Sequence, residues 1–245
     1  MIVVRRAHER GHADHGWLDS RHTFSFAQYH DPAHQGFSAL RVINQDVVAP
    51  GHGFPMHPHR DYEIYSWILA GSLAHADTTG ARATITAGGL QLISAGTGIA
   101  HEEYNPSATQ PVHFLQVWLH PDRPGHAPRY LEAHFDRSLR QGRLCPILVP
   151  EPMRGVAGTD GALPIRQDAW VFVALLHAGR DGAVTHRMAP GRAAWVHVAT
   201  GSVLIEGAPF GPGDSAAVTG QTSITLSPTG EDEAEVMVFD LIAPG

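Results

Sequence analysis

The chain of 245 residues contains no lysine, because all 17 of its basic residues are arginine. The absence of lysine excludes Schiff-base chemistry at a lysine amine, a P-loop lysine and a kinase lysine. Neither a G-x-S-x-G nucleophile elbow nor a G-x-G-x-x-G turn after a strand is present. Composition and motif content therefore exclude several common catalytic classes.

Cysteine is almost absent as well. The single residue, Cys145, excludes an intramolecular disulfide and cannot form a cysteine zinc site by itself. We interpret it as a small, semi-buried residue. This cysteine usage is typical of a reducing compartment, and we expect a cytoplasmic location.

Long apolar runs and basic clusters are also missing. The apolar run before Arg5 is too short for a signal-peptide core. The longest later runs, Val171–Leu176 and Val236–Phe239, have the length of strands and not of a membrane span. With 17 basic against 24 acidic residues the net charge is −7, and no basic stripe is present. We therefore expect neither a membrane nor a nucleic acid as a direct partner.

The chain is instead rich in turn residues, with 26 glycines and 18 prolines between short apolar runs. This pattern predicts an all-β fold. Strands are expected at 36–50, Ile64–Leu69, Ser72–Asp77, Ala83–Thr86, Leu90–Ser94, Val112–Leu119, Val171–Ala178, Ala193–Ala199, Ser202–Glu206, Ser215–Val218, Ser223–Leu226 and Glu235–Leu241. Helical periodicity is weak, and its best candidate is Tyr130–Gln141.

The two halves of the chain have a parallel layout. A strand, a tight glycine turn and a return strand occur at Tyr65–Ser72 and again at Ala194–Ser202. Gly213-Asp214 then follows the second unit as Gly88-Gly89 follows the first. This repetition predicts a duplicated β-barrel.

We accordingly expect an N-terminal barrel at 1–130 and a C-terminal barrel at 131–245. A connector rich in proline, glycine and arginine covers about 121–165. The second half contains neither an H-x-H nor an H-x-E string. Only the first barrel is therefore expected to bind a metal.

Two short strings carry the clearest chemical signal. His57 and His59 form one pair, and His101 and Glu103 form another, each with i, i+2 spacing. In a strand such side chains point to the same face, about 6.6 Å apart. Two pairs on neighbouring strands can converge on one ion. Three imidazoles and a carboxylate suit a first-row transition metal, whereas Ca²⁺ and Mg²⁺ prefer oxygen ligands.

The choice of carboxylate stays open at this point. Glu63 and Glu103 each lie an even number of residues from the neighbouring histidines. In a strand either carboxylate could therefore face inward with them. The chain has 18 histidines, and those scattered outside the two strings are interpreted as ordinary. They include His75, His113, His120, His126, His134, His177, His186 and His197.

A substrate cavity beside this site would be lined in part by apolar residues. Phe54 and Met56 are the expected lining residues, whereas Phe37 is assigned to ordinary core packing. On the strand Val112–Leu119, two alternating sets could face inward. They are His113, Leu115 and Val117, or Phe114, Gln116 and Trp118.

Longer strings resemble a known family. Gly51, His57, His59 and Glu63 resemble the first cupin motif, and Gly96–His101 followed by Asn105 resembles the second. More specifically, the chain resembles the pirins, which are two-barrel cupins (bicupins). The matching strings are Gly16–Leu18, His22–Ala27, Leu40–Asn44, His57–Asp61, Ser94–Ile99, Gly191–Trp195 and Gly213-Asp214.

This resemblance implies two tandem cupin barrels, which are double-stranded β-helices of jelly-roll type. It also implies one metal in the N-terminal barrel, with His57, His59, His101 and Glu103 as ligands and Glu63 in a supporting role. Pirins bind iron most often, so Fe(II) is expected, with Mn, Co, Ni, Cu or Zn as alternatives. Bacterial pirins are associated with quercetin 2,3-dioxygenase activity. A flavonol and dioxygen are therefore the expected substrates, with Glu103 as the catalytic proton acceptor.

Two other functions are compatible with the same ligands. Eukaryotic pirins act as nuclear cofactors of transcription factors, which implies a metal- or redox-dependent regulator that binds a protein partner. An isomerase or decarboxylating cupin would use the metal as a Lewis acid without oxygen. An apolar cavity at the site favours an enzyme, whereas a closed site below a flat charged patch favours a regulator.

Overall fold

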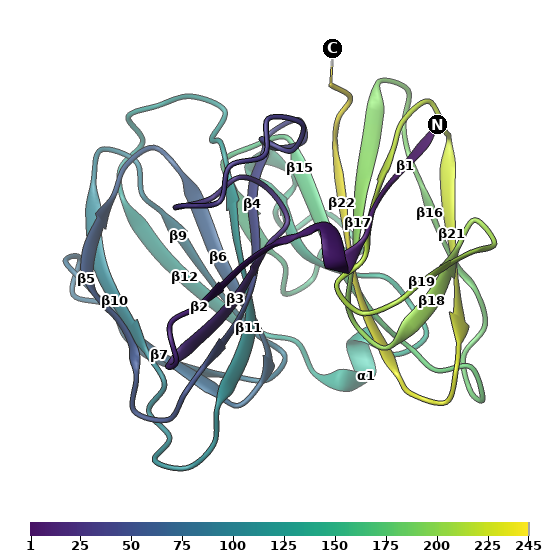
Figure 1. Ribbon diagram of the computed structural model, residues 1–245. Helices are drawn as coiled ribbons and strands as arrows, with labels where there is room; N and C mark the ends of the chain where they lie inside the picture. The colour runs from purple at the N-terminus through teal and green to yellow at the C-terminus, as the bar shows by residue number, and fades with distance from the viewer. Residues whose placement is uncertain (245) are drawn as a thin grey trace. The chain divides into compact units, whose positions relative to one another are not determined.

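The computed structural model describes residues 1–244 and consists almost entirely of β-strands (Figure 1). The contacts divide the chain into two compact units. One unit comprises residues 11–134 and 165–167, and the other comprises residues 1–10, 135–164 and 168–245. Helical segments in the described part are α1 (Arg137–Arg140) and 3₁₀ turns at Ala7–Glu9 and Glu151–Met153. None of these is long and apolar enough to cross a membrane.

The first barrel pairs a seven-stranded sheet with a four-stranded sheet. Their strand orders are β12-β9-β6-β11-β4-β3-β2 and β5-β10-β7-β8. The strands are β2 (Gly11–Asp14), β3 (Leu18–His22), β4 (Leu40–Val48), β5 (Gly53–His59), β6 (Glu63–Ala70), β7 (Ser72–Asp77), β8 (Arg82–Thr86), β9 (Gly89–Ser94), β10 (Ile99–Tyr104), β11 (Val112–Leu119) and β12 (Arg129–His134).

The second barrel repeats this plan, with strand orders β1-β20-β17-β22-β15-β13-β14 and β16-β21-β18-β19. The strands are β1 (Ile2–Arg5), β13 (Cys145–Pro150), β14 (Leu163–Ile165), β15 (Ala169–Leu176), β16 (Val184–Arg187), β17 (Arg192–Thr200), β18 (Ser202–Ile205), β19 (Ala208–Phe210), β20 (Ser215–Val218), β21 (Ser223–Thr229) and β22 (Ala234–Ile242). The order β20-β17-β22-β15 matches β9-β6-β11-β4 of the first barrel. The prediction of an all-β fold with two tandem barrels is confirmed.

Apolar side chains between the two sheets hold the first barrel together. The cluster around Ile68, Leu73, Val112 and Phe114 is buried between strands of both sheets. Burial of each such side chain contributes about 1.5–3 kcal/mol. On β11, Val112 and Phe114 belong to this cluster, and Leu115, Val117 and Leu119 are buried as well.

The predicted helix at Tyr130–Gln141 is wrong over most of its length. Residues Arg129–His134 form β12, which pairs with β9 from Arg129 opposite Ser94 to His134 opposite Gly89. Only Arg137–Arg140 is helical. The exposed edge of β9 offers unpaired backbone groups, and pairing with them outweighs the weak helical propensity of this segment.

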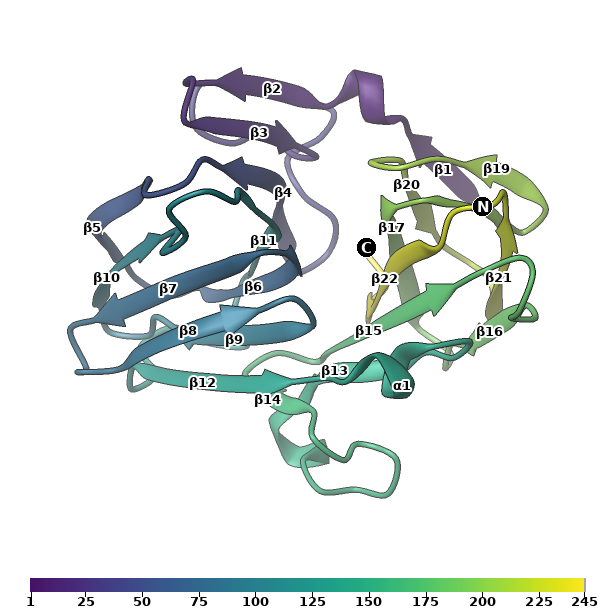
Figure 2. The ribbon, with the colours of Figure 1, turned by 90° about the horizontal axis from the view of Figure 1, so that it is seen from below.

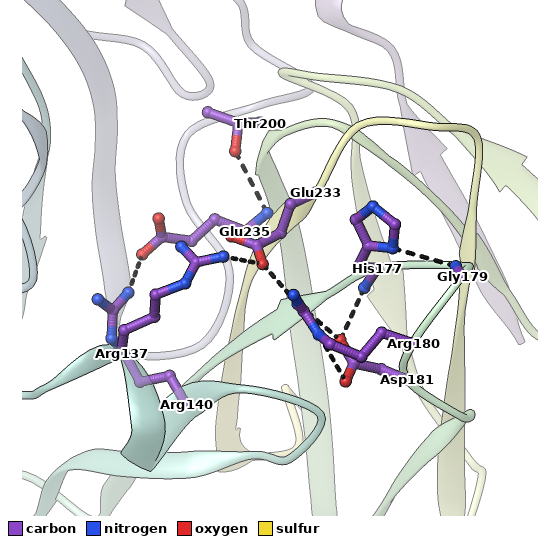
Figure 3. A network of polar contacts seen from close by, with 9 residues as sticks. All are labelled: Arg137, Arg140, His177, Gly179, Arg180, Asp181, Thr200, Glu233 and Glu235. Atoms are coloured by element: carbon purple, nitrogen blue, oxygen red, sulfur yellow. Dashed lines mark hydrogen bonds and ion pairs between the residues drawn. The ribbon is translucent and has the colours of Figure 1, made fainter.

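Ion pairs anchor α1 to the second barrel (Figure 3). Arg137 pairs with Glu233, and Arg140 pairs with Glu235 through Nη1 and Oε1 at 2.9 Å. Arg180 also reaches Glu233, at 2.8 Å. Burial would raise the pKa of Glu233, but the two arginines lower it below its usual value. The part of the expected connector that contains α1 therefore belongs to the second unit.

The first ten residues differ from the expected domain assignment. The sequence assigned 1–130 to the N-terminal barrel, but β1 pairs with β20, from Ile2 opposite Val218 to Arg5 opposite Ser215. The break between the units lies at 134/135, close to the expected 130/131. Residues 165–167 return to the first unit.

Candidate metal centre

The three predicted histidines lie on two adjacent strands. β5 and β10 are antiparallel neighbours in the four-stranded sheet, with His101 opposite His57 and Ile99 opposite His59 (Figure 2). The ring centroids are 4.7 Å apart for His57 and His59, 4.5 Å for His57 and His101, and 4.9 Å for His59 and His101. One nitrogen of each ring lies within 4.8 Å of the others. The structure therefore brings the three imidazoles together inside the first barrel.

A β-bulge next to the histidines changes which side chains face inward. Between His101 and Glu103 the register shifts, so that Glu103 lies opposite Phe54. The extra residue is on β5, and such bulges redirect side chains. Phe54 therefore shares the inner face with the histidines, whereas Met56 is 50% exposed. The prediction that Met56 lines the cavity is wrong, because Met56 is adjacent to His57 on β5 and therefore points to the opposite face, whereas the bulge brings Phe54 to the inner face.

Glu103 is buried and held by neutral donors. Ser66 Oγ donates to its Oε1 at 3.1 Å, and Gln116 Nε2 donates to its Oε2 at 3.0 Å. Gln91 Nε2 also donates to Oε1. Glu103 groups with His101 and not with the complete three-histidine cluster. The structure thus places this carboxylate beside one of the predicted ligands.

Two of the three histidines, His59 and His101, have lowered pKa values that favour the neutral form. Burial, together with the neighbouring His57 and His75, lowers the pKa of His101 to about 3. Burial, with His101 and His57, lowers the pKa of His59 to about 4. His57 Nδ1 lies 2.8 Å from the Pro55 carbonyl oxygen. Donation of a proton to this carbonyl leaves Nε2 with the lone pair that a metal requires.

His101 provides a test of whether a metal fits here. Its ring is completely buried, and neither nitrogen has a hydrogen-bond partner among the described residues. Buried polar atoms without partners are rare because their desolvation is not compensated. A metal ion at the three-histidine cluster would supply the missing partner for one nitrogen. Three neutral imidazoles are also the donor type that transition metals accept.

Glu63, the alternative carboxylate, lies elsewhere. Its Oε2 accepts hydrogen bonds from Ser94 Oγ at 2.9 Å and from the Arg166 backbone N–H at 3.3 Å. Burial raises its pKa despite these contacts. Glu63 belongs to neither group of potential metal ligands. Its direct contacts stabilise the end of β6 and the segment that carries Arg166.

His75 was interpreted as ordinary, but the structure places it beside two of the predicted ligands. β7 lies beside β10, with His75 opposite Glu103 and Asp77 opposite His101. A nitrogen of His75 comes within 4.8 Å of potential ligand atoms of His101 and Glu103. The signal was present as an H-x-D string at i, i+2 spacing on the predicted strand Ser72–Asp77.

A mostly apolar cavity opens beside the histidines. The space inside it that a water-sized sphere can reach is about 140 Å³, which is smaller than the roughly 300–1,000 Å³ of typical small-molecule sites. Among the two alternatives for β11, the set with Gln116 and Trp118 faces this cavity, and Phe37 does not line it. The lining includes Phe26, Phe54, His57, His59, Glu103, Gln116 and Trp118.

Two tandem double-sheet barrels, with the histidine cluster inside the first, define a two-barrel cupin. Residues 3–119 match the family model described as Pirin. Residues 156–241 match the model described as the quercetinase C-terminal cupin domain. The chain is 43% identical over 242 residues to a quercetin 2,3-dioxygenase of Escherichia coli strain K12, covering 98% of this chain and 99% of the relative. The chain belongs to the pirin family.

Further relatives agree with this assignment. A pirin-like protein of Caulobacter vibrioides is 37% identical over 242 residues, covering 98% of this chain and 99% of the relative. The solved structure of the bacterial pirin YhhW from Escherichia coli, in complex with nickel(II), superimposes with a TM-score of 0.89 at 42% identity. That comparison covers 100% of both chains. A relative of the same fold has thus been obtained with a divalent transition ion.

Proposed function

We propose that this protein is a metal-dependent dioxygenase that cleaves flavonols such as quercetin. The observation that carries the proposal is a cluster of three histidines that opens onto an apolar cavity. The quercetin 2,3-dioxygenase of Escherichia coli and the nickel complex of YhhW support the same function. The cavity also favours an enzyme over the alternative of a non-enzymatic regulator that binds a protein partner, for which a closed site would be expected.

We assign four ligands to the ion, which are His57, His59, His101 and Glu103. The metal proposed is Fe(II), because the family binds iron most often; Mn, Co, Ni, Cu and Zn are the alternatives. When bound, such an ion would supply Lewis-acid and redox chemistry and would lower the pKa of a coordinating hydroxyl.

Glu103 is the proposed catalytic base. A flavonol carries a hydroxyl beside a ketone, and removal of the hydroxyl proton makes the ring electron-rich enough to react with dioxygen. Gln116 and Ser66 donate to the carboxylate of Glu103 without carrying a positive charge. These hydrogen bonds hold the carboxylate in place at the wall of the cavity.

The cavity walls suit a flat aromatic substrate. Phe26 lies edge-on to Trp118 at 5.5 Å, and Trp118 lies edge-on to His59 at 4.8 Å. Aromatic side chains of this kind bury large apolar area and contact other rings favourably. The walls would hold a flavonol beside the histidines and exclude water from them.

Elemental analysis combined with a quercetin absorbance assay tests the proposal. We expect the wild type to bind one transition ion per chain and to consume quercetin only with oxygen. His57→Ala should lose the ion and the activity, whereas His30→Ala, which removes an exposed histidine of the same barrel, should change neither. Turnover that persists without oxygen would instead indicate a Lewis-acid isomerase or decarboxylase.

A further inference from the structure

Asp77 is a fixed, buried anion on β7. Its Oδ1 accepts hydrogen bonds from the Thr79 backbone N–H at 2.8 Å and from Thr79 Oγ1 at 2.6 Å. Its Oδ2 contacts His75 Nε2 at 2.9 Å. Burial would raise the pKa of Asp77, but the hydrogen bonds from Thr79 and His75 lower it below its usual value. Since a carboxylate only accepts, His75 donates to it through Nε2–H.

This contact determines the state of the other nitrogen of His75. In the neutral ring, Nδ1 carries the lone pair when Nε2 carries the proton. Nδ1 is buried and has no hydrogen-bond partner among residues 1–244. Tyr130 stacks on the ring, with centroids 4.5 Å apart and planes 18° apart. The ring is thus held between Tyr130 and Asp77 with an unused acceptor.

Within the described part of the chain, His101 lacks a hydrogen-bond acceptor for its ring N–H. A neutral imidazole has one N–H and one lone pair, and a metal takes the lone pair. The N–H of a metal-bound histidine is almost always donated to a carboxylate, a carbonyl or a water. In the neighbourhood of His101, the oxygens of Glu103 already accept from Ser66, Gln91 and Gln116. The His75 ring, whose Nδ1 is an unused acceptor, lies beside the His101 ring with 5.4 Å between the ring centroids.

We propose that Asp77 and His75 are positioning residues of the metal site: Asp77 fixes the tautomer of His75, and His75 Nδ1 accepts the N–H of His101 when His101 binds the ion. The present separation is longer than a hydrogen bond, so ion binding closes it by a small rotation of the rings. This inference rests on the proposed metal site. The relay Asp77–His75–His101 then fixes which nitrogen of His101 faces His57 and His59.

Nitrogen NMR of histidine-labelled protein tests the tautomers directly. In the wild type we expect His75 protonated at Nε2, and we expect the N–H resonance of His101 to shift when Zn²⁺ is added. Asp77→Asn can donate to His75 Nε2, so it should move the proton of His75 to Nδ1. A His75 protonated at Nδ1 in the wild type, or a tautomer unchanged by Asp77→Asn, would overturn the proposal.

Metal affinity provides the second test, measured by competition with a chromophoric chelator. His75→Phe keeps the ring volume and should weaken Ni²⁺ binding 10–100-fold, the usual effect of removing such a partner. His75→Gln, which retains an acceptor, should recover part of the loss. The control is His197→Phe, because His197 is equally buried but lies in the second barrel. Its Ni²⁺ affinity should match that of the wild type.

The outcomes separate this proposal from the proposed function. If the wild type binds no ion, the metal site itself is wrong. If the wild type binds one ion and His75→Phe binds it equally well, only the positioning role is lost. Two ions per wild-type chain, with one lost in His75→Phe, would make His75 a ligand and overturn the positioning role.

Discussion

At the scale of single residues, His101 is where the two groups of potential metal ligands overlap. It is the one residue shared by both groups of potential ligands among the described residues, and it is completely buried. Its neighbours on either side are His57 on β5 and Asp77 on β7. A change at His101 therefore affects both groups at once.

Replacement of His101 should abolish ion binding. We expect His101→Asn to weaken Ni²⁺ binding by more than about 100-fold, beyond the loss typical of a residue behind a ligand. Calorimetric titration measures this change, and His30→Asn is the matched control. An ion content equal to that of the wild type would show that His101 is not a ligand.

His59 and His101 should contribute almost no proton release when the ion binds at mildly acidic pH. The pKa of His59 is lowered to about 4 and that of His101 to about 3, so both rings are already neutral at pH 5.5. Neutral rings lose no proton when they bind, whereas ordinary histidines would be largely protonated at this pH. Titration at pH 5.5 in buffers of different ionisation enthalpy counts the protons. Release of a full proton from each of these two rings would contradict the lowered pKa values.

At the scale of elements, the pairing of β5 with β10 controls the inner face of the site. Gly53 lies opposite Tyr104 at the end of this ladder, next to the bulge. A Cβ atom at Gly53 would overlap the carbonyl oxygen of Glu103 and the Cα of Tyr104. These are backbone atoms, so the two strands would have to separate.

Gly53→Ala should therefore destabilise the protein and disturb the metal site together. Overpacking of this kind costs about 1–3 kcal/mol, and we also expect weaker Ni²⁺ binding because Glu103 shifts. Urea unfolding and calorimetric titration measure the two effects. Gly182→Ala is the control, because a Cβ there meets no atom within 4 Å. Equal stability of the two variants would rule out a close approach at Gly53.

At the scale of the whole molecule, the chain order and the barrel order differ. The N-terminal strand β1 forms the edge of a sheet in the second barrel, beside β20. The histidine cluster belongs entirely to the other unit. Stability contributed by β1 and metal binding by the cluster should therefore be separable.

Deletion of residues 1–5 tests this separation. It removes the ladder from Ile2–Val218 to Arg5–Ser215, so we expect a lower unfolding temperature by calorimetry. The number of ions bound per chain should stay equal to that of the full chain. A loss of ion content as large as that of His101→Asn would contradict the assignment of these residues.

The sequence by itself determined the local features of this protein. Short apolar runs between glycines and prolines predict the strands, and the repeated layout predicts two barrels. The i, i+2 spacing places His57 beside His59 and His101 beside Glu103 on one face, because side chains alternate along any strand. These features depend on neighbouring residues only.

Only the tertiary structure decided the features that depend on distant segments. The bulge in β5 turned Phe54 to the inner face, the edge of β9 made a strand of Arg129–His134, and β7 brought His75 and Asp77 beside the predicted ligands. Each outcome results from hydrogen bonding between strands far apart in the sequence. The order and register of such strands depend on how the whole barrel closes, and local periodicity contains no information about it.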